Sequence, residues 1–333
     1  MKKFLNNRNA YVDEMLDGIC EAHPDFYIRL GDSGRVLARK DSPVKGKVGI
    51  VTGGGSGHLP VFLGYVGRGL LDACAVGNVF AGPRVDDCLA AMNAANGGAG
   101  VLQLYGNYGG DKMNFDMAKE FAGSDGIEVS SVRVSDDVAS APPETREKRR
   151  GVAGLIYAYK IAGAKAEQRA SLAEVTAVAE KVVKVCRSIG VALSPCVVPE
   201  VGVAPFEVAE GTIEFGMGIH GEPGIWKGAM KSADDVAAEM LDRLLAEIST
   251  SRGDRVSLIV NSLGATPLEE LYILYRKIAR MLRDKGVHPV MPLIGRFATS
   301  MEMTGASLTV LPLDPELESL LKAPAYSPFW SVQ

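Results

Sequence analysis

The amino-acid sequence predicts an α/β fold of two domains, each a layered mixed or largely parallel sheet with flanking helices. Three observations support this prediction: strand-like and helix-like segments alternate from residue 47 onward, glycine-rich turns follow several strand-like segments, and some helices begin at recognisable capping residues. The 333 residues suggest about two domains of roughly 150 residues each. We place the boundary after two consecutive helical patterns, which gives domains 1–187 and 188–333.

The expected strands are short runs rich in β-branched residues. The first domain has such runs at 47–52, 99–105 and 129–134, and the second has them at 212–215, 255–261 and 289–294. Helical patterns separate most of these runs along the chain. Parallel strands need crossover connections of this kind, so largely parallel sheets are expected.

Two of the expected helices begin at a serine that can cap free backbone N–H groups. Ser171 forms a capping box with Glu174, valines follow at helical spacing, and Gly190 is the expected end of this helix. Ser232 with Asp235 begins another helix, which carries an apolar stripe at helical spacing.

A third helix is expected from residue 266 onward. Thr266 and Glu269 have the spacing of a capping box, Pro267 stands at the first helical position, and Gly286 is the expected end. The charged segment 144–150 is mixed in sign, so it is expected to be a solvated loop that opens a helix.

Composition excludes several classes of protein. Lys and Arg number 36 and Asp and Glu number 40, so the net charge is −4 and the chain has no bulk attraction for nucleic acid or anionic lipid. The N-terminus becomes polar too early for a signal peptide, and no apolar run approaches the roughly 20 residues that span a bilayer. The five cysteines form no CxxC pair, and HExxH-type metal motifs are absent. We expect a cytoplasmic protein that binds neither nucleic acid, membrane nor metal.

The first candidate site is the run Gly53-Gly54-Gly55-Ser56-Gly57-His58, directly after a predicted strand. Glycines at the carboxyl end of a strand let backbone N–H groups approach a ligand closely. No Gly-Lys-Ser/Thr follows, so this is not a Walker A phosphate loop. The alternative is a glycine-rich turn with an incidental histidine.

The second candidate site is the segment 216–224, where His220 stands between glycines. An imidazole so little obstructed can act as a base, a metal ligand or a nucleophile. The alternative is a turn histidine that is bonded to the backbone.

The third candidate site is the segment 106–111, which ends in Asp111 just after a predicted strand. An aspartate here can orient an imidazole, act as a base or bind a sugar hydroxyl. The alternative is a cap for the helix that follows.

Together these motifs resemble the substrate-binding subunit of dihydroxyacetone kinase, the DhaK family. The resemblance extends from about Tyr11 to Pro324, which is essentially the whole chain. The most specific stretches are 53–58, 64–67, Asn107 with 110–111, 151–154, 216–224 and 261–268.

The resemblance implies two α/β domains, a homodimer and a covalent mode of substrate capture. His220 would hold the ketone of dihydroxyacetone as a hemiaminal, with His58 and Asp111 as acid/base groups around it. The substrate pocket would be lined by Gly53, Gly54, Ser56, Gly57 and Gly106. The chain itself would bind no cofactor. ATP or ADP with magnesium would sit on a separate helical subunit, which in some systems is recharged by a phosphocarrier of the sugar phosphotransferase system.

Five positions depart from the family pattern. Leu59 replaces a glutamate, Gly106 and Gly109 replace a lysine and a threonine, and Ala81 and Gly82 replace a threonine and a serine. These changes remove polar side chains near the expected site and make room. One interpretation is a kinase for a larger ketose such as erythrulose or a branched pentulose, and the other is neutral drift in a dihydroxyacetone kinase. A non-catalytic, ketone-binding co-activator of the same family is a further alternative.

Overall fold

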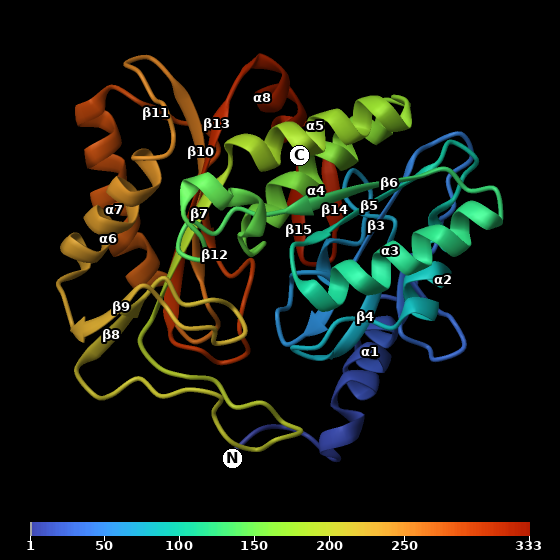
Figure 1. The fold of residues 1–333 in the computed structure, drawn as a ribbon, viewed down its shortest axis with the longest axis horizontal. Helices are drawn as coiled ribbons and strands as arrows, with labels where there is room; N and C mark the ends of the chain where they lie inside the picture. The colour runs from blue at the N-terminus through green and yellow to red at the C-terminus, as the bar shows by residue number, and fades with distance from the viewer. Residues whose placement is uncertain (1) are drawn as a thin grey trace.

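The computed structural model describes residues 2–333 and places two β-sheets on either side of a central pair of helices (Figure 1). All strands of the first sheet precede residue 135, and all strands of the second follow residue 186. The predicted α/β class is therefore confirmed.

The first sheet has six strands in the order β1-β2-β4-β3-β5-β6. The pairs β4–β3, β3–β5 and β5–β6 are parallel, while the pairs at the other edge are antiparallel. The parallel part matters for function, because it brings the carboxyl ends of β3 and β5 to the same edge. The strands are β1 (Tyr27–Leu30), β2 (Val36–Arg39), β3 (Gly49–Ser56), β4 (Ala73–Val79), β5 (Val101–Gly106) and β6 (Val129–Val134).

The second sheet has seven strands in the order β11-β10-β13-β7-β8-β9, with β12 also paired to β10. Only β11 and β12 run parallel to their neighbour β10; the other pairs are antiparallel. The expectation of a largely parallel sheet is thus wrong for this half. The strands are β7 (Arg187–Ala192), β8 (Thr212–Phe215), β9 (Trp226–Ala229), β10 (Arg255–Ser262), β11 (His288–Pro289), β12 (Leu293–Gly295) and β13 (Gly305–Leu313).

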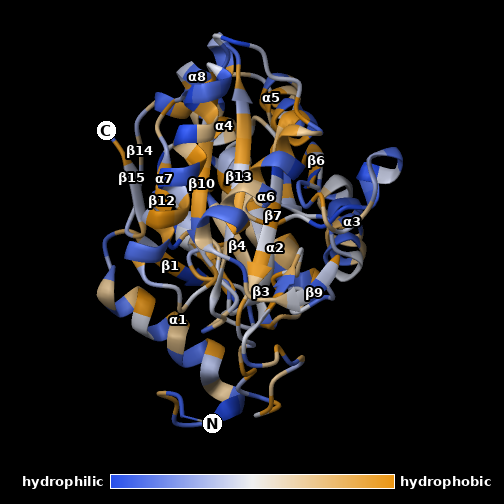
Figure 2. Ribbon diagram, turned by 90° about the vertical axis from the view of Figure 1, so that its left-hand side faces the viewer, coloured by the Kyte–Doolittle hydropathy of each residue, from blue (hydrophilic) through white to orange (hydrophobic). Residues whose placement is uncertain are grey.

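Helix α4 (Gly154–Glu167) is buried almost all round, as expected of a helix that is apolar on every face. It contacts strands of both sheets, and the largest hydrophobic core includes residues from both halves. Figure 2 shows apolar residues concentrated along the central strands β7, β10 and β13. The division into domains 1–187 and 188–333 stays a prediction, and α4 packs across it.

Of the remaining helices, α5 (Leu172–Val185) packs beside α4 in the centre, and the others cover the outer faces and ends of the two sheets. A short hairpin follows the last helix. The outer helices are α1 (Tyr11–Ala22), α2 (Val85–Ala95), α3 (Gly109–Ser124), α6 (Ala233–Leu245), α7 (Leu268–Lys285) and α8 (Pro315–Lys322), with short 3₁₀ turns at Arg8–Ala10, Leu63–Tyr65 and Pro143–Lys148 and the hairpin β14 (Ala325–Ser327) and β15 (Trp330–Val332).

Local signals in the sequence predict helix starts better than helix ends. The caps at Ser171 and Ser232 are confirmed. The predicted end at Gly190 is wrong, because α5 ends at Val185 and Gly190 lies inside β7, opposite Ser307 of β13.

Helix α7 gives a mixed result. Gly286 ends it in the left-handed conformation, as predicted. Thr266 is not its cap: its hydroxyl group donates to the carbonyl of Gly305 and accepts from the N–H of the same residue. The expected strand 289–294 is also wrong as a single unit, since β11 ends at Pro289 and β12 begins at Leu293. Among residues 2–333, no helix is both long and apolar enough to cross a bilayer.

Candidate active site

The three predicted motifs meet between the two sheets. Ser56 ends β3 and is followed by Gly57 and His58, while β5 leads through a short turn into α3, whose first turn carries Asp111. His220 lies in the loop between β8 and β9 of the second sheet. The imidazole rings of His58 and His220 lie only 4.8 Å apart, although 162 positions of sequence separate them (220 − 58).

Aromatic side chains surround the two imidazoles. The ring of Phe80 stacks on His58 with centroids 4.9 Å apart, and Phe62 meets the same imidazole edge-on. Tyr108 approaches His220 edge-on at 4.7 Å. Such an enclosure lowers the local dielectric, which strengthens every electrostatic interaction inside it.

His58 is fully buried and is held as a neutral base. Its Nδ1 lies 2.7 Å from the carbonyl oxygen of Thr299, so Nδ1 carries the proton and donates it. Nε2 therefore carries the lone pair, and this buried atom has no hydrogen-bond partner. Burial lowers the pKa of His58 to about 3, and electrostatic repulsion from His220 acts in the same direction. The ring can accept a hydrogen bond from a ligand hydroxyl group but stays unprotonated at neutral pH.

His220 is held by a carboxylate instead. Its Nδ1 lies 3.0 Å from Oε1 of Glu222, and its backbone N–H donates to Oε2 of the same residue. Although burial disfavours the charge of Glu222, the hydrogen bond and charge of His220, together with the charge of Arg150, lower the pKa of that carboxyl to about 2. The ionised carboxylate keeps the proton on Nδ1 and leaves the lone pair on Nε2, which is the arrangement that a nucleophilic imidazole needs.

Asp111 is buried, and its Oδ1 has no hydrogen-bond partner. Burial raises the pKa of Asp111 to about 6, against the opposing charge of His220. The alternative that this residue is a helix cap is wrong, because α3 has Tyr108 at its N-cap and no side-chain cap. A buried carboxyl with a pKa close to neutral is suited to proton transfer.

The glycines of the first motif are required mainly by close packing. A Cβ at Gly54 would clash with the ring of Phe62, and one at Gly53 would lie 2.8 Å from the carbonyl oxygen of Ala75. Gly57 has a φ of +98° and lies against the ring of Phe80.

The two remaining predicted pocket residues lie beside groups of the site. Ser56 is buried, and its hydroxyl group donates to the carbonyl of Gly77. Gly106 lies against the ring of Tyr108: a Cβ at Gly106 would be 3.1 Å from the nearest ring carbon. Roles in substrate binding for Gly53, Gly54, Ser56, Gly57 and Gly106 stay a prediction.

The ion pairs and hydrogen bonds of Glu222, Arg149 and Arg150 were not predicted from the sequence. Glu222 follows His220 by two positions, and no local pattern marks it as the partner of that imidazole. The segment 144–150 is not simply a solvated loop: Arg149 is fully buried and forms two hydrogen bonds with Glu247, and Arg150 pairs with Asp137.

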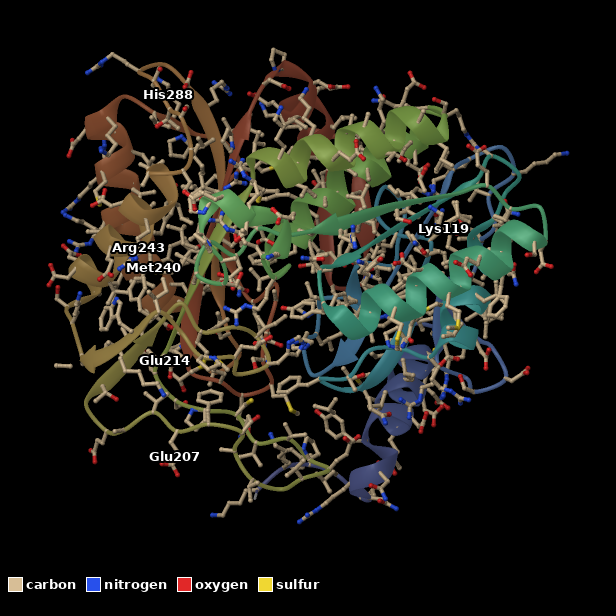
Figure 3. The ribbon with its side chains drawn as sticks, in the orientation of Figure 1. Lys119, Glu207, Glu214, Met240, Arg243 and His288 are labelled. Atoms are coloured by element: carbon tan, nitrogen blue, oxygen red, sulfur yellow. The ribbon has the colours of Figure 1, made fainter. Side chains whose placement is uncertain are left out.

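Asp136 and His288 have surroundings of their own. Asp136 accepts from the backbone N–H groups of Val152 and Gly154, which explains its burial without a cation. No group of three or more metal-binding side chains exists in residues 2–333. His288 lies at the far end of the second sheet from Glu214 (Figure 3).

Comparison with known proteins gives matches along nearly the whole chain. The family described as Dak1 domain matches residues 17–329. The chain is 44% identical to the "PTS-dependent dihydroxyacetone kinase 1, dihydroxyacetone-binding subunit DhaK" of Listeria innocua, over 99% of this chain and 100% of that relative. It is 41% identical to the "D-erythrulose kinase" of Mycolicibacterium smegmatis, over 98% of this chain but 56% of that relative.

Two solved structures share the fold closely. The dihydroxyacetone kinase of C. freundii, in complex with AMP-PNP and Mg²⁺, superposes with a TM-score of 0.90 at 35% identity, over 99% of this chain. The present chain spans 61% of that kinase chain. The dihydroxyacetone kinase operon co-activator Dha-DhaQ superposes with a TM-score of 0.86 at 33% identity, over 94% of this chain and 96% of that one.

Proposed function

The chain belongs to the Dak1 family, as its motifs predict, and from this premise we propose that it is the ketose-binding subunit of a dihydroxyacetone-type kinase. Such an enzyme is a phosphotransferase whose nucleotide is bound by a separate subunit. The observation that carries the proposal is the meeting of His58 and His220 in one aromatic enclosure, with the buried carboxyl of Asp111 close enough for His220 to influence its pKa.

Covalent capture of the ketone is assigned to His220. Its Nε2 lone pair attacks the carbonyl carbon, a C–N bond forms, and the carbonyl π electrons move to the oxygen, which takes up a proton to become a hydroxyl group. The ring gains a positive charge in this step. Glu222 stands 3.0 Å from Nδ1 and stabilises that charge as an ion pair. Release of the Nδ1 proton to water then leaves the neutral hemiaminal and balances the proton that the carbonyl oxygen took up.

Proton transfer from the hydroxyl group to be phosphorylated is assigned to Asp111. Its pKa of about 6 lies close to working pH, whereas His58 with a pKa of about 3 holds a proton poorly. His58 instead accepts a hydrogen bond at Nε2 and orients the substrate. Because the predicted adduct needs a carbonyl group, a polyol such as glycerol cannot form it.

We propose that the phosphoryl group comes from a partner. The C. freundii kinase, which contains AMP-PNP and Mg²⁺, has a longer chain than this one. We propose a helical partner subunit that carries ATP or ADP with magnesium, served by a phosphocarrier in the phosphotransferase-system version, and a homodimeric assembly of this chain.

A larger ketose is the second candidate substrate, favoured by the space around the site. A Cβ at Gly109 would meet nothing within 4 Å, and Gly82 lies directly against Oδ1 of Asp111. Gly82 thus leaves a side chain out beside a carboxyl oxygen that has no partner, and Gly109 leaves open space at the start of the same helix. An additional hydroxyl group of erythrulose or of a branched pentulose fits that acceptor, and the D-erythrulose kinase of M. smegmatis is a relative at 41% identity.

The structural similarity to the co-activator Dha-DhaQ supports the alternative that this chain is a non-catalytic co-activator. A coupled assay with a family nucleotide-binding subunit, ATP and magnesium distinguishes the two. Phosphorylation of dihydroxyacetone or erythrulose that is lost in His220→Ala supports the kinase. Ketose binding without turnover under the same conditions contradicts it.

A further inference from the structure

The segment 297–301, which we name the strap, lies between β12 and β13 and reaches both histidines of the site. Ala298, Thr299, Ser300 and Met301 are all buried. None of the three sequence motifs includes this segment, and the mechanism proposed above assigns it no role.

The strap holds His58 by two hydrogen bonds and the preceding residue, Gly57, by a third. The carbonyl of Thr299 accepts the Nδ1 proton of His58 at 2.7 Å, and the N–H of Thr299 donates to the backbone carbonyl of His58 at 3.3 Å. The N–H of Met301 donates to the carbonyl of Gly57 at 2.7 Å. Because a backbone carbonyl can only accept, this contact fixes the tautomer of His58 and leaves Nε2 unprotonated.

The next residue of the strap holds the loop of His220. The hydroxyl group of Ser300 donates to the carbonyl of Ile219, the residue before His220, at 2.5 Å. Ser300 is fully buried, and its N–H donates to the carbonyl of Leu263 at 2.7 Å. Two consecutive residues, Thr299 and Ser300, thus contact the two elements that carry the imidazoles.

Asn261, at the carboxyl end of β10, holds the strap itself. Its Oδ1 accepts from the N–H groups of Phe297 and Ala298 at 2.8 and 2.9 Å, and its Nδ2 donates to the carbonyl of Ala298 at 2.7 Å. A further bond at 3.0 Å joins Nδ2 to Ser307 of β13. These four bonds use the full capacity of a buried amide, so its geometry is fixed. The stretch 261–268, which the sequence marks as specific to the family, thereby gains a structural role.

We propose that Ser300 and Asn261 are positioning residues, which act through the strap to set the spacing of His58 and His220 and the tautomer of His58. For its effect on the reaction, this inference rests on the proposed function. The positions and protonation states of the two imidazoles are properties of the free chain and can be measured without turnover.

The test compares Ser300→Ala with Ser257→Ala in the intact chain. Ser257 is also fully buried, and its hydroxyl group also donates to a backbone carbonyl, that of Met291 at 3.2 Å. Both variants lose a hydrogen bond to a backbone carbonyl, and Ser257→Ala also loses the bond that Ser257 accepts from the hydroxyl group of Tyr157 at 2.8 Å. Ser257→Ala should therefore lose at least as much thermal stability as Ser300→Ala. Only Ser300→Ala is expected to weaken the binding of carbonyl-labelled dihydroxyacetone, by about tenfold, as expected from the loss of one buried hydrogen bond.

Nitrogen NMR of histidine-labelled protein provides a second readout, with His58→Asn for assignment. Wild-type protein is expected to show His58 protonated at Nδ1 only, and Asn261→Ala is expected to show a mixture of tautomers. Equal ketose binding by Ser300→Ala and wild type, or an Nε2-protonated His58 in wild type, would overturn the inference. If wild type binds no ketose, the proposed function fails, and the tautomers of wild type and Asn261→Ala still decide the role of the strap.

Discussion

The imidazole rings of His58 and His220 have centroids 4.8 Å apart, yet their surroundings differ in burial and in charge. His58 is fully buried and faces a backbone carbonyl, so a charged ring would be neither solvated nor paired. The side chain of His220 is 20% exposed and faces the ionised carboxylate of Glu222. The same residue type thus becomes a fixed hydrogen-bond acceptor at His58 and, in the mechanism that we propose, a nucleophile at His220. The group that faces Nδ1 differs between the two rings: it is the carbonyl of Thr299 for His58 and the carboxylate of Glu222 for His220, and this difference sets the role of each imidazole.

The largest effect is expected from Asp111, the proposed base. Asp111→Asn removes the proposed base and should lower kcat by about a thousandfold, within the usual range for general base catalysis. Formation of the ketose adduct should persist, because His220 and Glu222 are unchanged. Turnover and adduct formation are measured separately, with Asp116→Asn, an exposed position of the same helix, as control. A variant that keeps more than a tenth of wild-type kcat would exclude Asp111 as the base.

The next largest effect is expected when His220, like His58, is given an uncharged hydrogen-bond partner. Glu222→Gln gives His220 a neutral partner and removes the carboxylate that pairs the positive ring. Ketose affinity should fall by about a hundredfold, as expected when a hydrogen bond to a charged group is lost from a buried site. Titration by carbon NMR measures it. Glu207→Gln, on an outer loop (Figure 3), should leave affinity unchanged, and a similar loss in both variants would sink the assignment.

The pH dependence of activity distinguishes Asp111 from His58 as the base. Burial raises the pKa of Asp111 to about 6, so the base is ionised above that pH and protonated below it. Activity should therefore fall about tenfold per unit as pH drops below 6, and this limb should disappear in Asp111→Asn. His58, with a pKa of about 3, contributes no limb between pH 5 and 9. A limb that survives in Asp111→Asn would contradict the assignment.

The raised pKa of Asp111 also affects folding: ionisation of this carboxyl group raises activity but lowers the free energy of unfolding. A carboxyl group whose pKa is higher in the folded than in the unfolded protein favours folding in its protonated form. Its ionised form therefore costs stability above about pH 6. Asp111→Asn should be at least as stable as wild type at pH 8, a result that thermal unfolding can check alongside the kinetics. A less stable variant would indicate a structural role for the carboxylate.

The smallest effect concerns the substrate. A side chain at Gly82 would meet Oδ1 of Asp111, so Gly82→Ser should move that carboxyl or pair it with the new hydroxyl group. We expect the ratio of kcat/KM for erythrulose over dihydroxyacetone to fall about tenfold. Gly123→Ser, where a Cβ meets nothing within 4 Å, is the control. An unchanged ratio would place substrate selection elsewhere in the site.

Sequence reasoning found the parts of the site that are local in the chain. Glycine runs with a histidine after a strand, and an aspartate in the first turn of a helix, are patterns of a few residues, and the structure places these segments around the two histidines. The contacts that differentiate the two imidazoles are not local. His58 meets Thr299, and Ile219 meets Ser300, across long separations that no periodicity encodes. The antiparallel order of the second sheet was missed for the same reason, since alternation of strands and helices does not determine which strands pair.

Carbon NMR of carbonyl-labelled dihydroxyacetone and erythrulose, added to the chain alone, tests the central claim most directly. If His220 is the nucleophile, a tetrahedral-carbon signal appears with at least one ketose and is absent in His220→Ala, while His58→Asn retains it at lower occupancy. The ketose that gives the stronger signal is the better substrate candidate. Absence of the signal with both ketoses, or its persistence in His220→Ala, would contradict the account.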